Sequence, residues 1–352
     1  MKTTLLSILS LTTLLTACGG EDSDSTSLPI SEPESLELIF SDPIQAPNVE
    51  GVKFANDVKY GEHANQRFDI YMPASDTPTG LLLFFHGGGF TGGNEDSIYD
   101  KLGTGVSDLL AAGYAVATAT YQLIDGSHFD GVKRSLNDTK YALQFIRHHS
   151  GVLNINKEQI VLAGGSAGAS SSLWIGLQDD MADASATDPV LSESTRVKGI
   201  AITETQSTLN TSRWNSEVFA EYNISDEDGV ALGGGAQRAL LFYGVIPTAE
   251  ALADPLSYID SPEIQQYRAD VDNLSFITSD DPELWVSNTK QKVAAPTGTG
   301  SYFHHAYHAK TIQVYANNAS VPGVYYYGKN AELFNDESQE TQIAFILRKL
   351  AE

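Results

Sequence analysis

The chain has 352 residues, a formal net charge of −24 and a sequence pI of about 4.5. This acidity excludes proteins that bind nucleic acid, or dock on anionic lipid, through basic surfaces. The single cysteine, Cys18, excludes disulfides, a thiol nucleophile and a cysteine metal site in the rest of the chain. The glycine run at 233–235 lacks both a preceding strand and a following Lys-Ser/Thr, so it predicts a loop and not a phosphate site. We therefore expect no cofactor.

The first residues are typical of a bacterial lipoprotein signal. Lys2 precedes an apolar segment at 5–15 that is too short to span a bilayer. The run Leu-Thr-Ala-Cys ends at Cys18, the residue that would receive the lipid. An ordinary secretory signal with a chance cysteine is the alternative. We expect a signal peptide at 1–17, a flexible acidic tether at 18–40, and an exported protein anchored in the cell envelope, at the outer membrane.

Residues 41–352 alternate between strand patterns and helix patterns. Apolar runs predict buried parallel strands, and apolar residues at helical spacing predict amphipathic helices. The predicted strands are 57–60, 67–72, 81–85, 114–121, 160–163, 197–203, 283–287 and 324–327. The predicted helices are 97–112, 131–148, 169–177, 306–317 and 339–350. This alternation predicts an α/β domain with a doubly wound, mostly parallel sheet, and residues 210–270 are expected to form a helical lid insertion.

The most informative motif is Gly-Gly-Ser-Ala-Gly at residues 164–168. A predicted strand leads into it and a predicted helix leads out, which is the context of a G-x-S-x-G nucleophile elbow. Glycines flank the serine because the turn is strained and its backbone passes close to a neighbouring helix. Ser166 is therefore the candidate nucleophile.

A second motif, His-Gly-Gly-Gly-Phe at residues 86–90, directly follows the predicted strand 81–85. Glycines leave backbone N–H groups free to face a ligand, as an oxyanion hole requires. Two such motifs, at the ends of separate strands and in this order, indicate acyl-transfer chemistry at the carboxyl edge of the sheet.

With these two motifs the chain resembles the α/β-hydrolase fold. Within that fold it is similar to the esterases related to hormone-sensitive lipase and to the bacterial feruloyl-esterase-like carboxylesterases. Residues 121–123, Tyr-Gln-Leu, are similar to the Tyr-Arg-Leu that follows the fourth strand in this family. The resemblance implies that Ser166 is the nucleophile. It also implies that the backbone N–H groups of Gly88, Gly89 and Ala167 form the oxyanion hole, in a loop shaped by His86.

The usual places for the other two members of a serine triad are empty. The acid should follow the penultimate strand and the histidine the last strand. Residues 288–292 contain no Asp or Glu, and residues 328–331 contain no His. Asp281 and Asp280 are the remaining candidates for the acid. Both precede the predicted strand 283–287, so they lie at its amino end and not at its carboxyl end. They would be well placed only if 274–278 were the penultimate strand. The alternative is that these residues form a turn that begins a strand.

The candidates for the base are three histidines just ahead of, and within, the predicted helix 306–317. They are His304, His305 and His308. His305 is the first choice and His308 the second, and one helical turn would place these two on one face. That spacing also permits a metal pair, but no third ligand is evident, so we expect no metal. Loop histidines without a catalytic role are the alternative.

These features predict a lipid-anchored serine hydrolase of small-molecule carboxylic esters, acting on short-chain or aryl esters through an acyl-enzyme. The main alternative is a pseudo-hydrolase that has lost its proton relay and serves as a membrane-anchored ligand-binding protein. A peptidase and a carbohydrate-specific deacetylase are further alternatives. An imidazole within hydrogen-bond reach of Ser166 would favour the enzyme.

Overall fold

The computed structural model describes residues 36–352 apart from residues 44 and 46. The predicted signal peptide, Cys18 and most of the predicted tether lie outside the described residues, so lipid anchoring remains a prediction. Contacts within the chain divide it into Met1–Glu37 and Leu38–Glu352, and the description below concerns the second unit. Within the described residues, no helix has the length and apolar character needed to cross a membrane.

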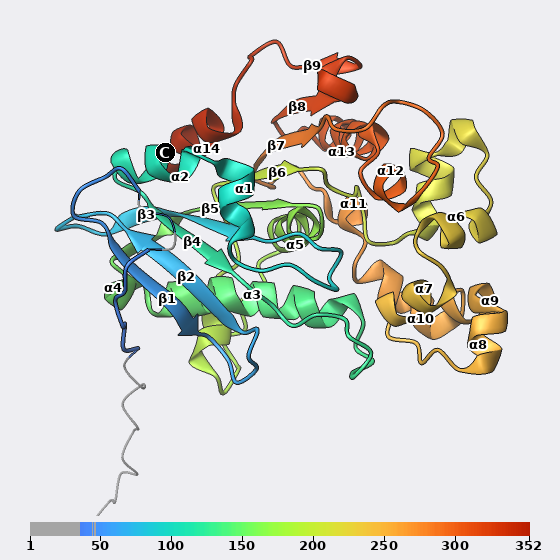
Figure 1. Ribbon diagram of the computed structural model, residues 1–352, viewed down its shortest axis with the longest axis horizontal. Coiled ribbons are helices and arrows are strands. Elements are labelled where there is room, and N and C mark those ends of the chain that lie inside the picture. Colours follow the sequence, from blue (N-terminus) through green and yellow to red (C-terminus); the bar gives the residue numbers. More distant parts are fainter. Residues whose placement is uncertain (1–35, 44, 46) are drawn as a thin grey trace, which may run out of the picture. The chain divides into compact units, whose positions relative to one another are not determined.

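One nine-stranded sheet organises this unit, in the order β1-β2-β4-β3-β5-β6-β7-β8-β9 (Figure 1). The strands are β1 (Lys53–Lys59), β2 (Arg67–Met72), β3 (Thr79–Phe85), β4 (Ala115–Ala119), β5 (Ile155–Gly165), β6 (Gly199–Thr203), β7 (Glu283–Asn288), β8 (Gly323–Tyr327) and β9 (Phe334–Asn335). The strands from β4 to β8 pair in parallel, and β1, β2 and β9 pair antiparallel at the two edges. The predicted α/β class with a mostly parallel sheet is confirmed.

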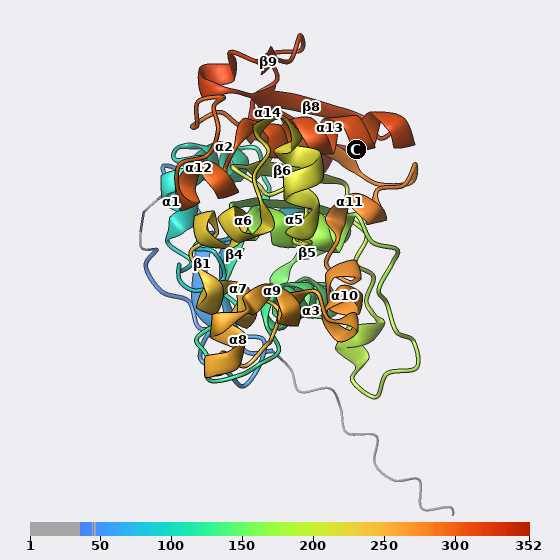
Figure 2. The same ribbon diagram turned by 90° about the vertical axis from the view of Figure 1, so that its right-hand side faces the viewer.

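Helices cover both faces of the sheet (Figures 1 and 2). One face carries α1 (Ser97–Leu102), α2 (Gly105–Ala111) and α14 (Gln342–Leu350). The other carries α3 (Val132–His148), α5 (Ala167–Gly176) and α13 (Ala306–Ala319). The middle parts of the central strands, such as residues 81–85 of β3 and 160–163 of β5, are apolar because neither of their faces meets water.

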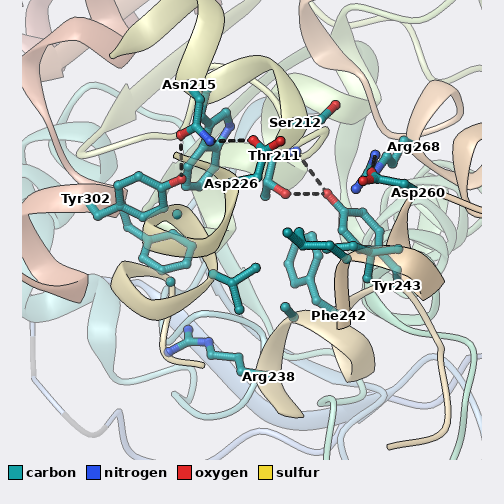
Figure 3. A pocket seen from close by; sticks show the side chains of 18 residues that line it. Thr211, Ser212, Asn215, Asp226, Arg238, Phe242, Tyr243, Asp260, Arg268 and Tyr302 are labelled. Atoms are coloured by element: carbon teal, nitrogen blue, oxygen red, sulfur yellow. Dashed lines mark hydrogen bonds and ion pairs between the residues drawn. The ribbon is translucent and has the colours of Figure 1, made fainter. Parts of the chain in front are cut away.

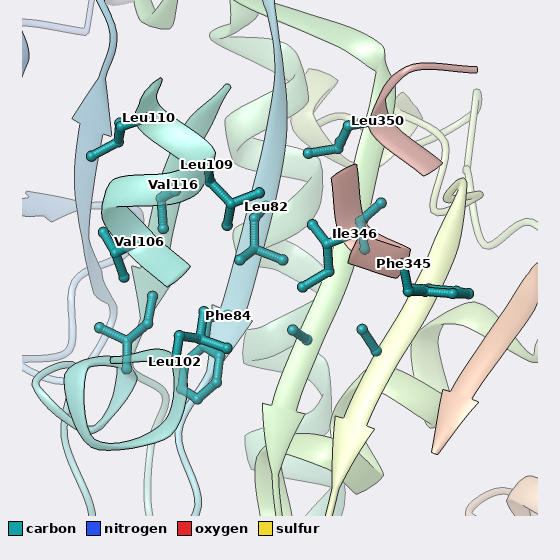
Figure 4. Close-up of a cluster of buried hydrophobic side chains, with 14 of the residues drawn as sticks. Leu82, Phe84, Leu102, Val106, Leu109, Leu110, Val116, Phe345, Ile346 and Leu350 are labelled. Carbon is teal, nitrogen blue, oxygen red and sulfur yellow. The ribbon is translucent and has the colours of Figure 1, made fainter. Parts of the chain in front are cut away.

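Strand β3 shows how alternate side chains serve the two layers. Every residue of this strand is buried. Leu82 and Phe84 point toward α2 and α14, where they pack with Val106, Leu109 and Ile346 (Figure 4). The residues between them point to the opposite face, as the period of two in a strand requires. This packing fixes β3 and its carboxyl end, which leads directly into the glycine-rich loop.

Several parts of the chain differ from the predicted elements. The predicted helix 97–112 is broken at Gly103, whose φ of 52° is incompatible with a continuous helix, so α1 and α2 are separate. The two-residue strand β9 was not predicted. The segment 274–278, considered as an alternative strand, lies largely in the short helix α11 (Asn273–Phe276).

The long connection from β6 to β7 contains the residues predicted to form a lid. It holds α6 (Asp226–Leu232), α7 (Ala236–Phe242), α8 (Ala249–Ala253), α9 (Pro255–Ile259), α10 (Pro262–Ala269) and α11. Two further short helices lie elsewhere, α4 (Ser150–Leu153) and α12 (Thr299–Phe303). Figures 1 and 2 both show α7 to α10 gathered together, apart from the sheet.

Close backbone contact at Gly168 leads to a stability prediction. A Cβ at this position would lie 1.9 Å from the carbonyl oxygen of Phe85, so β3 and α5 would have to move apart. Gly168→Ala should lower the free energy of unfolding by about 1–3 kcal/mol or more, measured by urea denaturation. The control is Gly151→Ala, where a Cβ would meet nothing within 4 Å; it should leave stability unchanged or raise it by about 0.4–1 kcal/mol. Equal effects of the two substitutions would contradict this account.

Candidate active site

Ser166 occupies a strained turn between β5 and α5. Its φ of 55° and ψ of −118° are uncommon for a residue with a side chain. The backbone N–H of Ser166 donates to the carbonyl oxygen of Thr203 at 3.0 Å, which fixes the turn against the end of β6. Surrounding packing must hold such a conformation, and here the close approach at Gly168 does so. The result is a serine side chain that lines a cavity at the carboxyl edge of the sheet.

The side chain that reaches Ser166 is His304. This residue follows α12, and its Nε2 lies 2.9 Å from the Ser166 Oγ. Burial, together with the positive charges of Lys290 and Lys101, lowers the pKa of His304 from 6.5 to about 4. The imidazole is therefore neutral at pH 7, and its Nε2 is free to accept the hydroxyl proton.

Gln206 holds the segment that carries His304. Its Nε2 donates to the carbonyl oxygen of Phe303 at 2.9 Å, one residue before the histidine. Its Oε1 accepts from the Ser170 hydroxyl at 2.9 Å, one helical turn after Ser166. This buried amide therefore links the two segments that bear the serine and the histidine.

His305 and His308 do not reach the serine, so the two preferred choices for the base were wrong. Both rings are buried, and each has both nitrogens occupied. In His305, Nδ1 accepts from the Tyr307 N–H and Nε2 donates to the carbonyl oxygen of Ala294. In His308, Nδ1 accepts from the Ser207 N–H at 3.2 Å, and Nε2 donates to a carbonyl oxygen at 3.0 Å. The face that these two histidines share is a packed face.

Asp280 and Asp281 are also far from the required place, and the predicted acid was wrong. Both precede β7 and so lie at its amino end. Asp280 pairs with Arg196 at 2.6 Å, and Asp281 accepts from the Thr278 N–H at 2.8 Å, which makes both structural. Desolvation raises the pKa of Asp281 to about 6, but no histidine faces it.

An asparagine stands where the acid would be expected, at the carboxyl end of β7. Asn288 is fully buried, and its Oδ1 accepts from the Thr205 N–H at 2.9 Å. Its Nδ2 donates to the carbonyl oxygens of Thr205 and His305. No carboxylate of the described residues lies within 4.0 Å of the His304 ring; the histidine that has such a contact is His148, with Glu193. The arrangement is a serine–histidine dyad.

The glycine loop supplies donors beside the serine. Gly88 and Gly89 have φ of 114° and 62°, and a Cβ on Gly88 would lie 2.0 Å from a backbone oxygen, so glycine is required there. The His86 ring stacks on Tyr121, whose hydroxyl donates to the His86 carbonyl oxygen at 2.7 Å. Among the described residues, the N–H groups of Gly88, Gly89 and Ala167 donate to no other group. They are free to bind an oxyanion.

The cavity around Ser166 measures about 440 Å³, which is within the range of small-molecule sites. Its walls combine the glycine loop, α1, the β6 end and α7 of the insertion, and its apolar part includes Leu209, Trp214, Phe242 and Phe303. Over the described residues, no group of three or more His, Cys, Asp or Glu side chains is arranged to hold a metal ion.

Solved structures show the same fold. A truncated form of a carbohydrate esterase from gut microbiota is 14% identical, covers 85% of this chain and 96% of its own, and has a TM-score of 0.57. Esterase B from Lactobacillus rhamnosis is 14% identical, covers 87% of each chain, and has a TM-score of 0.55. At these identities the likeness concerns the fold alone. No curated protein sequence matches the chain.

The family match covers the elbow, the glycine loop and most of the insertion. The model of the BD-FAE family matches residues 68–266, which is more than half of the chain. Those residues contain both motifs from which the site was inferred. The chain belongs to the BD-FAE family of esterases with the α/β-hydrolase fold.

Proposed function

We propose that this protein hydrolyses carboxylic esters with short acyl chains or aryl groups, using Ser166 as nucleophile and His304 as general base. The observation that carries the proposal is the 2.9 Å contact between the Ser166 Oγ and the His304 Nε2. A nucleophile and a base within hydrogen-bond reach are the minimum that acyl transfer requires. This contact also favours an enzyme over a binding protein that has lost its relay.

The proposed reaction uses the groups around Ser166 in turn. The Ser166 Oγ attacks the ester carbonyl carbon while the His304 Nε2 takes the hydroxyl proton. The N–H groups of Gly88, Gly89 and Ala167 stabilise the oxyanion of the tetrahedral intermediate, aided by the N-terminus of α5. The proton then passes to the leaving alkoxide, and the C–O bond of the ester breaks. Water, activated by the same imidazole, hydrolyses the acyl-enzyme and releases the acid.

The lack of an acidic partner makes His304 a weaker base than the histidine of a complete triad. A triad carboxylate would stabilise the imidazolium that forms during attack, and here Lys290 and Lys101 oppose it. In place of a carboxylate on the ring, the bond from Gln206 to the carbonyl oxygen of Phe303 holds the backbone that carries His304. We therefore expect a lower kcat than that of an enzyme with a complete triad. We also expect activity to persist to lower pH, because His304 stays neutral there.

Substitution of the dyad tests the proposal directly. Ser166→Ala should lower kcat for a short-chain aryl ester by at least about 10³-fold, because it removes the nucleophile. His304→Ala should lower it by about 10²–10⁴-fold, because it removes the base. His128→Ala is the matched control, since His128 is exposed and is not among the residues that line the cavity; it should match wild type. If His304→Ala retained activity within tenfold of wild type, His304 would not be the base.

The pH dependence supplies a separate prediction. His304 acts only when neutral, and its pKa is lowered to about 4, so kcat/KM should hold from pH 7 to about pH 5 and fall around pH 4. Lys290→Met removes a positive charge that lowers this pKa, so it should move the acid limb to higher pH. Lys53→Met, an exposed lysine on β1, is the control and should not move it.

Fluorescence at each pH would confirm that the protein stays folded. An acid limb centred at pH 6.5 or above in the wild type would contradict the assigned environment of His304.

A further inference from the structure

Arg238 of the insertion reaches into the active-site cavity. A Cβ placed on Gly89 would lie 2.5 Å from the Arg238 Nη2, so the guanidinium lies against the glycine loop. The guanidinium carbon also lies 5.1 Å from the centre of the Phe303 ring, the residue before His304. Arg238 therefore sits between the oxyanion loop and the segment that carries the base, and it lines the same cavity as Ser166.

This guanidinium has no partner among the described residues. It makes no ion pair within 4.0 Å and donates no hydrogen bond there, whereas every other arginine of the chain donates to a carboxylate, a side-chain amide or a carbonyl oxygen. Figure 3 shows the contrast: Arg268 lies beside Asp260, and Arg238 stands apart from both acidic side chains drawn. Burial lowers the pKa of Arg238, and no nearby charge offsets that cost. Arg238 is half-buried, so a ligand with an anionic group would give it a charge-assisted partner that the chain itself does not supply.

Lys101 brings a second positive charge to the cavity, from α1. A Cβ on Gly165, the residue before the nucleophile, would lie 3.4 Å from the Lys101 Cε. Glu204 and Asp100 attract this ammonium, but no carboxylate of the described residues lies within 4.0 Å of its Nζ. Desolvation and Lys290 lower the pKa of Lys101.

Arg238 is the unusual cation of the two, because most lysines of the described residues also lack an ion pair within 4.0 Å, as Lys101 does. The chain carries a net charge of −24, and five of the other seven arginines pair with a carboxylate. The apolar walls formed by Trp214, Phe242 and Phe303 suit an aryl or alkyl body, and the cations suit an anionic group on it.

We propose that Arg238, assisted by Lys101, binds a carboxylate carried by the ester, so that the preferred substrates are monoanionic esters. This rests on the proposed ester hydrolysis. The planar guanidinium supplies two parallel N–H donors to the carboxylate, while the ester carbonyl lies in the oxyanion hole beside it. The carboxylate belongs either to the acyl part or to the alcohol part of the ester.

Matched pairs of esters test the inference and distinguish its two forms. With the charge on the alcohol part, 4-acetoxybenzoate is compared with its methyl ester. With the charge on the acyl part, the mono-4-nitrophenyl ester of adipic acid is compared with 4-nitrophenyl hexanoate. For one of the two pairs, Arg238→Gln should lower kcat/KM for the charged ester, relative to kcat/KM for its neutral partner, by about 10- to 100-fold. This is the effect expected from losing a charge-assisted hydrogen bond. Arg238→Lys should keep part of the ratio.

Two further comparisons keep the test decisive if Arg238→Gln fails to fold. Lys101→Met should lower the same ratio by up to about fivefold, and Lys53→Met, which also removes one charge, should leave it unchanged. Added salt should weaken hydrolysis of the charged ester alone. Ratios unchanged in Arg238→Gln and Lys101→Met, with no selective salt effect, would overturn the inference.

Hydrolysis of the neutral esters reports separately on the proposed function. If no ester is cleaved, calorimetry on Ser166→Ala still tests the site, because this variant can bind the charged ester without turning it over. Binding of 4-acetoxybenzoate should then be about 10- to 100-fold tighter with Arg238 than with the additional Arg238→Gln change. Equal binding would overturn the inference whatever the outcome for catalysis.

Discussion

The hydrogen bond between Ser166 and His304 joins residues 138 positions apart, and each partner is held by a different constraint. Ser166 is held by the backbone, at a positive φ that the packing around Gly168 enforces. His304 lies at the end of a short helix whose last carbonyl group is tied to α5 by Gln206. The rest of the sheet serves to bring these two segments to one edge, since β5 and β7 both end there.

The absent acid changes the electrostatics of the site. Asn288 occupies the position expected for the carboxylate. Its side-chain amide donates to the carbonyl oxygens of Thr205 and His305, so it holds these loops in place but adds no negative charge to the site. Burial, together with the positive charges of Lys290 and Lys101, lowers the pKa of His304 and keeps its imidazole neutral. The same positive environment, extended by Arg238, is the feature that favours an anionic ester. The absence of the triad carboxylate thus affects both the pKa of the base and the charge of the substrate that the cavity favours.

The sequence predicted the fold and one half of the site because these depend on local patterns. Strand β3 was recognised from its unbroken apolar run, and the elbow from glycines that its close contacts require. The base depended on tertiary packing instead. His305 and His308 do lie close together, but His305 is the N-cap of α13, and both rings pack against Phe219 and not against the serine. His304 is positioned by the short helix α12 and by the bond from Gln206 to the carbonyl oxygen of Phe303, and neither constraint leaves a pattern in the sequence around the histidine.

The most direct test of this account is covalent labelling with an aryl organophosphate, which reacts far faster with an activated serine than with other side chains. Mass spectrometry of the intact protein and of its peptides would count and locate the adduct. The account predicts one phosphoryl group on Ser166, added much more slowly in His304→Gln and absent in Ser166→Ala. A folded wild-type protein that took up no label, or took it on another residue, would contradict the assignment of Ser166 and His304 as the reacting pair.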